Sequence, residues 1–219
     1  MTVCGSLQHR SANRAALAVV SSVAVDRGAT VDDYDRLAEI PAFDPDRDDE
    51  RIDVIADWRE RVTMADAVLV AAPEYAGGIA GAVKNAFDWL VGSGNMYRKP
   101  VGLISAGTSG GQHARQAMAQ TLTWQGAYVV AELGIAAPRT KSDDEGLFTD
   151  VHTLAAISSL TNALIDASAT PAPELVDRAR SVVSALGVDS AQASGDAKTS
   201  DGTRARRRSG RVPASAGRR

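Results

Sequence analysis

Residues 67–72 read Ala-Val-Leu-Val-Ala-Ala and run directly into Pro73, Glu74 and Tyr75. An unbroken apolar run that ends at a proline is typical of a strand covered on both faces, because such a strand shows no alternation of polar and apolar side chains. Residues 80–91, which follow the loop, have the apolar spacing of a helix. This stretch therefore predicts a buried strand, a loop and a helix in succession.

The same succession repeats on both sides of residues 67–91. Apolar runs predict strands at 3–4, 29–31, 67–72, 101–106 and 127–135, and helical spacing predicts helices at 11–27, 51–64, 80–91, 111–124, 146–167 and 173–186. Residues 38–49, which are rich in proline and aspartate, are expected to form a loop.

Strands that alternate with helices pair in parallel through right-handed crossovers. Five of them fit the α/β architecture of a flavodoxin-like doubly wound parallel sheet, with strand order 2-1-3-4-5 and helices on both faces. In such sheets a ligand binds beyond the carboxyl ends of the strands, where the strand order reverses. This rule directs attention to the loops after the first, third and fourth strands.

The first of these loops, residues 5–14, leads from a strand to the start of a helix. It carries hydroxyl groups at Ser6 and Ser11 and an amide at Asn13, and the free N–H groups and dipole of a helix start favour a phosphate. The loop matches neither the dinucleotide fingerprint nor the P-loop. Capping of the helix by Ser11 explains the same residues equally well, so both interpretations stay open at this point.

The second loop, residues 73–81, places an aromatic side chain before glycines, since Tyr75 precedes Gly77 and Gly78. Glycine lets a backbone approach a flat ring closely, and an aromatic side chain can pack beside such a ring. For Tyr75 taken alone, an exposed aromatic residue on a surface loop is the simpler interpretation.

The third loop, residues 105–113, follows a strand and contains Gly107, Gly110 and Gly111. Three glycines indicate close approach of the backbone to a ligand, although turns also favour glycine. His113 is better explained as a polar rim residue than as a base, because no acidic partner or metal-spaced histidine accompanies it.

Taken together, the three loops resemble the NADPH-dependent FMN reductase family of flavodoxin-like proteins, which includes quinone, chromate and azo-dye reductases. The family pattern GSLRxxSxN is matched at Gly5, Ser6, Leu7, Ser11 and Asn13, and the longer pattern PEYNxSxPGxLKNxxDW is matched at Pro73, Glu74, Tyr75, Gly81, Lys84, Asn85, Asp88 and Trp89. The chain departs from these patterns at Gln8 and Ala76, which replace arginine and asparagine, and at Gly78 and Ala80, which replace serine and proline. Arg10 is close enough in sequence to substitute for the arginine.

The resemblance implies a reductase that transfers hydride from NADPH or NADH to bound FMN and then to a small electron acceptor, such as a quinone, a flavin, an azo dye or chromate. It implies no catalytic acid or base and no metal. The implied cofactor site has three parts: Ser6, Gln8, Arg10, Ser11 and Asn13 around the phosphate; Pro73, Glu74, Tyr75, Ala76, Gly77 and Gly78 beside the ring; and Ser105, Gly107, Gly110 and Gly111 along the isoalloxazine.

The resemblance also implies a homodimer or homotetramer, because in such reductases a second subunit commonly completes the open face of the ring. The helix at 85–90, with Phe87 and Trp89, is the expected interface. Two other functions stay open: a one-electron carrier of the flavodoxin kind, and a non-enzymatic FMN-binding protein that acts through a basic tail. The body of the chain lacks the dense acidic rim that the redox partner of a carrier would recognise.

The carboxyl-terminal part of the 219-residue chain differs in charge from the rest. Residues 187–219 hold 8 Lys and Arg against 3 Asp and Glu, whereas residues 1–186 hold 16 against 24. The last segment has no aromatic residue and too little apolar surface to order itself. We therefore predict a flavodoxin-like domain at 1–168, a helix at 169–186 and a disordered basic tail at 187–219, which can contact polyanions non-specifically.

Composition limits the classes of protein to which the chain can belong. A single cysteine, Cys4, excludes an internal disulfide framework and a cysteine-based metal site. No apolar run reaches the ~18 residues of a membrane span, and the first residues do not have the pattern of a signal peptide. We expect a cytoplasmic protein that does not enter the membrane.

Overall fold

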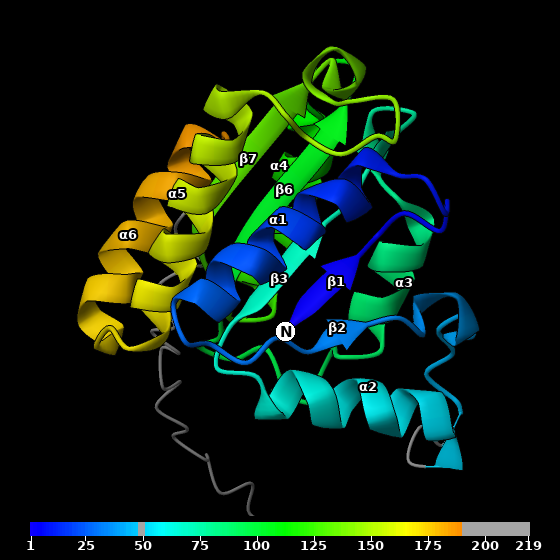
Figure 1. The fold of residues 1–219 in the computed structure, drawn as a ribbon. Helices are drawn as coiled ribbons and strands as arrows, with labels where there is room; N and C mark the ends of the chain where they lie inside the picture. Colours follow the sequence, from blue (N-terminus) through cyan, green and yellow to red (C-terminus); the bar gives the residue numbers. More distant parts are fainter. Residues whose placement is uncertain (48–50, 190–219) are drawn as a thin grey trace, which may run out of the picture.

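The computed structural model describes residues 1–47 and 51–189 (Figure 1). The strands of the main sheet are β1 (Thr2–Cys4), β2 (Asp33–Tyr34), β3 (Val68–Ala71), β6 (Pro100–Gly107) and β7 (Tyr128–Ala136), and a separate hairpin consists of β4 (Glu74–Tyr75) and β5 (Gly78–Ile79). The helices are α1 (Ala12–Asp26), α2 (Asp53–Met64), α3 (Gly81–Asp88), α4 (Gln112–Trp124), α5 (Val151–Ser168) and α6 (Ala172–Ala185), with short 3₁₀ helices η1 (Leu37–Glu39) and η3 (Pro138–Lys141). The predicted basic tail lies outside the described residues, apart from residues 187–189.

The main sheet has five parallel strands in the order β2-β1-β3-β6-β7, which confirms the predicted flavodoxin-like topology. Val3 of β1 lies between Tyr34 of β2 and Val70 of β3, and Val70 lies beside Leu103 of β6. The carboxyl ends of the strands therefore meet at one edge of the sheet, which is the upper edge in Figure 1. The sequence pattern of residues 73–81 does not predict the β4–β5 hairpin, which lies outside this sheet.

Helices cover both faces of the sheet (Figure 1). Helices α1 and α5 pack on one face, where Leu17 and Ile157 are buried in the same cluster. Helices α2, α3 and α4 pack on the other face, where Trp58 and Met118 are buried. Strand β3 is buried along its whole length, as a strand covered on both faces must be. No helix within the described ranges is long and apolar enough to cross a bilayer.

The second strand lies at residues 33–34 rather than at the predicted 29–31. It is an edge strand in which only one side chain, Tyr34, is buried, so its sequence contains no apolar run. The ring of Tyr34 packs against Trp58 of α2 with 4.7 Å between centroids. This single anchor sets the position of the strand, because apolar periodicity cannot locate a strand of two residues.

Helix α5 starts at Val151, five residues later than predicted. Asp150 accepts a hydrogen bond from the Thr153 N–H (2.8 Å) and so caps the helix at that point. Gly146 has a φ of 86°, which interrupts helical geometry before the cap. The residues between Gly146 and Asp150 are therefore not helical and lie at the carboxyl edge of the sheet.

Side chains at the end of α3 form hydrogen bonds to the loop that precedes α2. Asn85 Oδ1 accepts from the Phe43 N–H (2.8 Å), and Asn85 Nδ2 donates to the Pro41 carbonyl (2.8 Å). Trp89 Nε1 donates to the same carbonyl (2.9 Å). Phe87 and Trp89 are each 1% exposed. The prediction that these two side chains form a subunit interface is therefore wrong, because both are packed inside the chain itself.

Helix α6 covers the outer edge of the sheet along β7. Leu175 and Ala179 are buried with the layer that contains α1 and α5, whereas Val183 is buried with the layer that contains α2, α3 and α4. Arg178 Nε donates to the Val130 carbonyl of β7 (3.0 Å). An edge covered in this way is protected from pairing with a strand of another chain.

The β4–β5 hairpin turns through Ala76 and Gly77, whose φ angles are 51° and 72°, and Tyr75 pairs with Gly78 across the turn. Two consecutive residues with positive φ form a type I′ turn, which matches the twist of the flanking strands. Glycine adopts this conformation freely, but alanine does so at a cost. Asparagine, which the family pattern has in place of Ala76, tolerates it better than most residues.

Replacing Ala76 with asparagine is expected to stabilise the protein by about 1 kcal/mol, because asparagine tolerates the left-handed conformation. Ala76→Val is the matched control at the same exposed position and should destabilise the protein, since β-branched residues fit positive φ poorly. Urea unfolding followed by tryptophan fluorescence measures both variants. An Ala76→Asn protein no more stable than the parent would show that the turn carries no strain at this residue.

Candidate functional site

A cleft of about 1200 Å³ lies at the carboxyl edge of the sheet. Its walls come from four segments: residues between 6 and 18 at the start of α1, residues 73–75 before and within β4, residues 106–108 at the end of β6, and residues between 137 and 147 after β7. We call this cavity the carboxyl-edge cleft. The strand order reverses between β1 and β3, which is where doubly wound sheets bind ligands.

The carboxyl-edge cleft brings together nine of the fifteen predicted cofactor residues. The nine are Ser6, Gln8, Arg10, Ser11, Asn13, Pro73, Glu74, Tyr75 and Gly107. Six predicted residues do not line the cleft: Ala76, Gly77, Gly78, Ser105, Gly110 and Gly111. The first three of these lie in the hairpin beyond Tyr75, and the last three are buried behind the wall.

The amino end of α1 opens into the cleft. Ser11 caps the helix, because its Oγ accepts from the Asn13 N–H (3.2 Å). Ser6 Oγ accepts from the Gln8 N–H (3.3 Å). Other N–H groups in the first turn have no partner within the helix, as at any helix start. Capping and anion binding are therefore compatible here, since the cap uses only part of the available donors.

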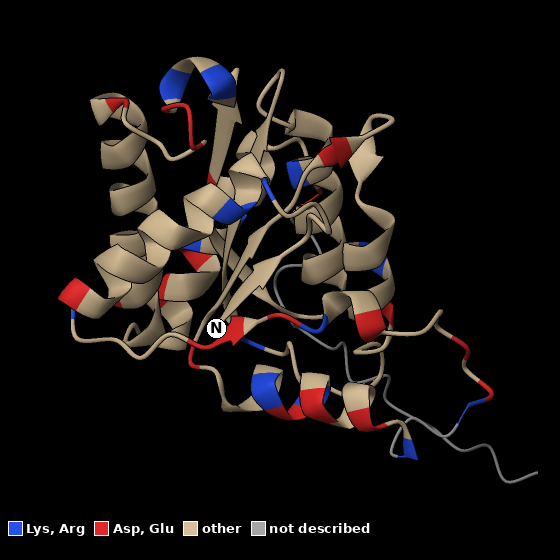
Figure 2. Ribbon diagram, turned by 45° about the vertical axis from the view of Figure 1, so that its right-hand side comes forward, with Lys and Arg blue, Asp and Glu red and all other residues tan. Residues whose placement is uncertain are grey.

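Basic side chains surround the start of α1. Arg10 and Arg14 are exposed and line the cleft, and the first turn of α1 contains no acidic residue. On the facing wall, η3 contributes Arg139; this helical turn is blue at the upper edge of Figure 2. Three cations and a helix amino end in one region favour the binding of an anion.

The side chain of Asn13 joins α1 to β6. It is 2% exposed. Its Nδ2 donates to the Ala106 carbonyl (3.1 Å), and its Oδ1 accepts from the Ala106 N–H (2.9 Å). The amide is therefore engaged with the backbone, and the hydroxyl and N–H groups around it are better placed to bind a phosphate.

Glu74 caps the amino end of α4. Its Oε2 accepts from the N–H groups of His113 (2.8 Å) and Ala114 (3.1 Å). A carboxylate at this position satisfies donors that the helix cannot satisfy itself and interacts favourably with the helix dipole. Glu74 thereby fixes the hairpin to α4 and directs the neighbouring Tyr75, which is 58% exposed, to the wall of the cleft.

The glycine-rich turn between β6 and α4 is packed tightly on its inner side. Ser105 is fully buried, and a Cβ on Gly111 would stand 1.9 Å from Ser105 Oγ. Gly111 also has a φ of 62°. Gly107 differs from them, because no atom lies within 4 Å of the Cβ it lacks. Gly107 therefore presents open backbone to the cleft, whereas Gly111 is required for packing.

The fourth wall of the cleft, which follows β7, contains none of the predicted cofactor residues. Its lining residues are Ala137, Pro138, Arg139, Thr140, Ser142, Asp143, Asp144, Glu145, Gly146 and Leu147. A signal was available, because every strand of a parallel sheet sends its carboxyl-terminal loop to the same edge. The helix predicted at 146–167 included the last residues of this wall, so they were not expected to lie in a loop at the cleft.

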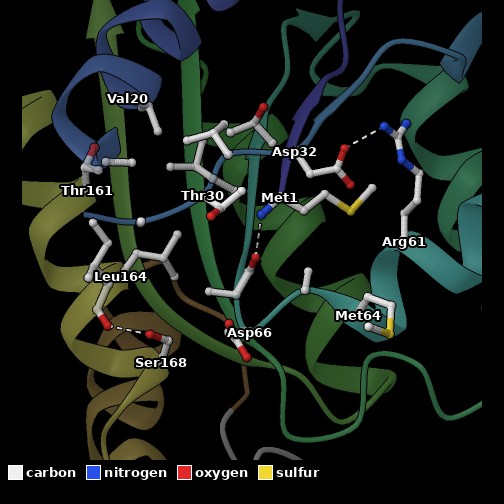
Figure 3. A pocket seen from close by; sticks show the side chains of 18 of the residues that line it. Met1, Val20, Thr30, Asp32, Arg61, Met64, Asp66, Thr161, Leu164 and Ser168 are labelled. Atoms are coloured by element: carbon white, nitrogen blue, oxygen red, sulfur yellow. Dashed lines mark hydrogen bonds and ion pairs between the residues drawn. The ribbon is translucent and has the colours of Figure 1, made fainter. Parts of the chain in front are cut away.

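A second cavity, of about 510 Å³, lies at the opposite edge of the sheet and is shown in Figure 3. There the Met1 ammonium donates to the Ala67 carbonyl (3.0 Å), and Arg61 pairs with Asp32. Burial lowers the pKa of the Met1 ammonium, and the negative charge of Asp32 opposes that shift. None of the predicted cofactor residues lines this cavity. Among the described residues no group of three His, Cys, Asp or Glu side chains is arranged to hold a metal ion.

Asn13→Ala is expected to destabilise the protein by about 2–4 kcal/mol, because two buried backbone groups of Ala106 lose their partner. Ser11→Ala should cost about 1 kcal/mol, the value of a helix cap. Urea unfolding of the flavin-free protein measures both, so the result does not depend on a ligand. The assignment of Asn13 to a structural role would be contradicted by a loss no larger than that of Ser11→Ala.

Comparisons with known proteins show the family to which the chain belongs. Residues 1–141 match the family model described as NADPH-dependent FMN reductase. The chain is 30% identical over 140 residues to a quinone reductase of Escherichia coli K12, covering 59% of this chain and 72% of that protein. It is 26% identical over 171 residues to an NAD(P)H:quinone oxidoreductase of Solanum tuberosum, covering 74% of this chain and 88% of that protein.

A solved structure has the same fold. The flavoenzyme FerB of Paracoccus denitrificans, an NAD(P)H:acceptor oxidoreductase, superimposes with a TM-score of 0.65 at 23% identity, covering 77% of this chain and 95% of that one. The family match extends from β1 through η3 and so includes residues from all four walls of the carboxyl-edge cleft. The chain belongs to the NADPH-dependent FMN reductase family of oxidoreductases.

Proposed function

We propose that the carboxyl-edge cleft holds FMN and that the protein uses it to pass hydride from NAD(P)H to a small acceptor such as a quinone. The observation that supports this proposal is the composition of the cleft. A helix amino end with hydroxyl groups lies on one side, and open glycine backbone and an exposed aromatic ring lie on the others. This set of groups suits a ligand that combines a phosphate with a flat ring.

The residues of the cleft fit FMN. The N–H groups at the start of α1, with the hydroxyls of Ser6 and Ser11 and the charge of Arg10, would hold the phosphate. The missing side chain of Gly107 leaves the backbone of β6 open, so a planar ring can lie against it. Tyr75 would form the wall beside the ring.

Bound FMN supplies the redox chemistry, since it can take a hydride from the nicotinamide and give it to the acceptor. The work of the chain would be to position these molecules, since the cofactor carries the redox chemistry. The cationic side chains of Arg14 and Arg139 would attract the phosphate groups of the nicotinamide donor. Water at the open mouth of the cleft would supply the proton that the acceptor needs.

A one-electron carrier is the second candidate, and the structure contains an observation in its favour. Asp143, Asp144 and Glu145 are exposed along the cleft, and an acidic rim is what a basic redox partner would recognise. Arg139 and Lys141 lie directly before them in the chain and offset part of their charge. The reductase is favoured, because a rim of mixed charge provides weaker steering for a protein partner.

Further parts of the proposal concern assembly and location. We expect a homodimer or homotetramer in which a second subunit covers the cleft. Tyr75 of the cleft wall (58% exposed) and Leu7 (56% exposed), which stands in the sequence between the lining residues Ser6 and Gln8, provide apolar surface for such a contact. A cytoplasmic location, a domain boundary at 168 and a basic tail that contacts polyanions stay predictions.

The reductase is tested by mixing the FMN-loaded protein anaerobically with NADPH or NADH in a stopped-flow spectrometer. We expect bleaching of the flavin absorbance in one phase and its return when a quinone is added, because the cleft is open to both molecules. A carrier would show slow bleaching with both nicotinamides but rapid exchange of single electrons with a redox protein. That result would replace the reductase with the carrier.

The phosphate assignment is tested with Ser6→Ala/Ser11→Ala. This variant should bind FMN more weakly by about 1–3 kcal/mol for each lost charge-assisted hydrogen bond. Riboflavin, which lacks the phosphate, is the matched ligand and should bind both proteins equally. Fluorescence titration of the flavin-free protein gives all four affinities. An equal loss for the two ligands would mean that the serines act on the fold rather than on the phosphate.

A further inference from the structure

An ion pair between α4 and β7 lies directly behind the glycine-rich turn. Arg115 Nη1 pairs with Glu132 Oε2, and the two side chains are 12% and 26% exposed. A partly buried ion pair of this kind contributes little net stability, because removing the two charges from water offsets most of their attraction. Stability alone therefore does not explain why the two charges lie here, and the other contacts of Arg115 indicate a different role.

Arg115 also binds the turn itself. Its Nε donates to the Gly110 carbonyl (3.2 Å). The guanidinium lies over Gly134 of β7, since a Cβ on Gly134 would stand 2.7 Å from Arg115 Nη2 and 2.7 Å from the Gly110 carbonyl oxygen. Burial lowers the pKa of Arg115, and the negative charge of Glu74 opposes that shift. Arg115 is thus within the field of the carboxylate that fixes the hairpin.

The turn at 107–111 has an inner and an outer side. Gly110 and Gly111 are buried, whereas Gly107 and Thr108 line the carboxyl-edge cleft. The two sides are coupled over a short distance, because the Gly110 N–H donates to the Gly107 carbonyl (3.1 Å). A force that holds Gly110 against β7 therefore also sets the backbone that faces the cleft.

We propose that Arg115 and Glu132 are positioning residues that hold the 107–111 turn against β7 in the conformation that receives the cofactor ring. Glu132 fixes the guanidinium, the guanidinium fixes the Gly110 carbonyl, and Gly134 leaves the space in which they meet. The consequence for flavin binding rests on the proposed function, whereas the effect on the turn does not.

The test removes both charges together. In Arg115→Met/Glu132→Met neither charge is left without its partner, and replacing an ion pair shielded from water with apolar side chains of similar volume is often neutral for stability, so the fold is retained. The matched control is Arg27→Met/Asp166→Leu, which removes the exposed pair between α1 and α5. Gly134→Ala is a second probe, because its methyl group would push apart the Arg115 guanidinium and the Gly110 carbonyl without removing any charge.

Hydrogen exchange of the flavin-free proteins reports on the turn itself. The amides of Gly110 and Ala137, which both donate to the Gly107 carbonyl, should exchange about tenfold faster in the double variant and in Gly134→Ala, as for a local opening made easier by loss of one hydrogen bond. Amides of β3 serve as the internal reference and should not change. Arg115→Lys should restore only part of the protection, since lysine lacks the planar fork of arginine.

FMN titration then tests the consequence for the cleft. The double variant should bind FMN about tenfold more weakly, which corresponds to about 1.4 kcal/mol, and the Arg27→Met/Asp166→Leu control should bind it normally. Unchanged exchange at Gly110 and Ala137 would overturn the inference whatever the flavin result. Faster exchange with unchanged FMN affinity would overturn the role toward the ring. If the parent protein bound no FMN, the proposed function would fail, and the exchange data alone would decide whether Arg115 holds the turn.

Discussion

The amide of Asn13 is the interaction on which the geometry of the carboxyl-edge cleft depends. By pairing with both backbone groups of Ala106, it ties the amino end of α1 to the end of β6, two segments more than 90 residues apart in the chain. The amino end of a helix and the end of a strand are thereby held together at the cleft. Because the bond is buried, it competes little with water and can keep this spacing while the mouth of the cleft stays open.

Many residues of the family patterns serve to build the walls rather than to meet the ligand. Glu74 caps α4, Asn85 and Trp89 fasten the loop that contains Pro41, and Gly111 makes room for Ser105. The groups left to contact a ligand are hydroxyls, backbone N–H groups, one aromatic ring and several cations. A site of this kind suits a chain that positions a cofactor and leaves the chemistry to it.

Basic and acidic side chains occupy different parts of the rim of the carboxyl-edge cleft. Arg10 and Arg14 lie on the α1 side, and Arg139 faces them from η3. The acidic residues 143–145 follow at once on the same wall. Cations around a helix amino end favour a ligand with several phosphate charges, and the adjacent acidic stretch limits how strongly the rest of the rim attracts anions. The partly buried Arg115–Glu132 pair joins α4 to β7 behind this surface.

The sequence by itself determined the fold and the edge of the sheet at which the carboxyl-edge cleft lies. Continuous apolar runs at 67–72 and 101–106 specify strands buried on both faces, and alternation with helices then leaves the doubly wound topology. Tertiary structure alone decided the roles within the site, because hydrogen bonds such as Asn13 to Ala106 join residues far apart in the chain and leave no periodic pattern. It also placed β2 at Tyr34, turned Phe87 and Trp89 into the core, and brought residues 137–147 to the cleft. Periodicity reports which face of an element is apolar, whereas partners across the fold depend on which elements meet, and that is fixed only when the chain packs.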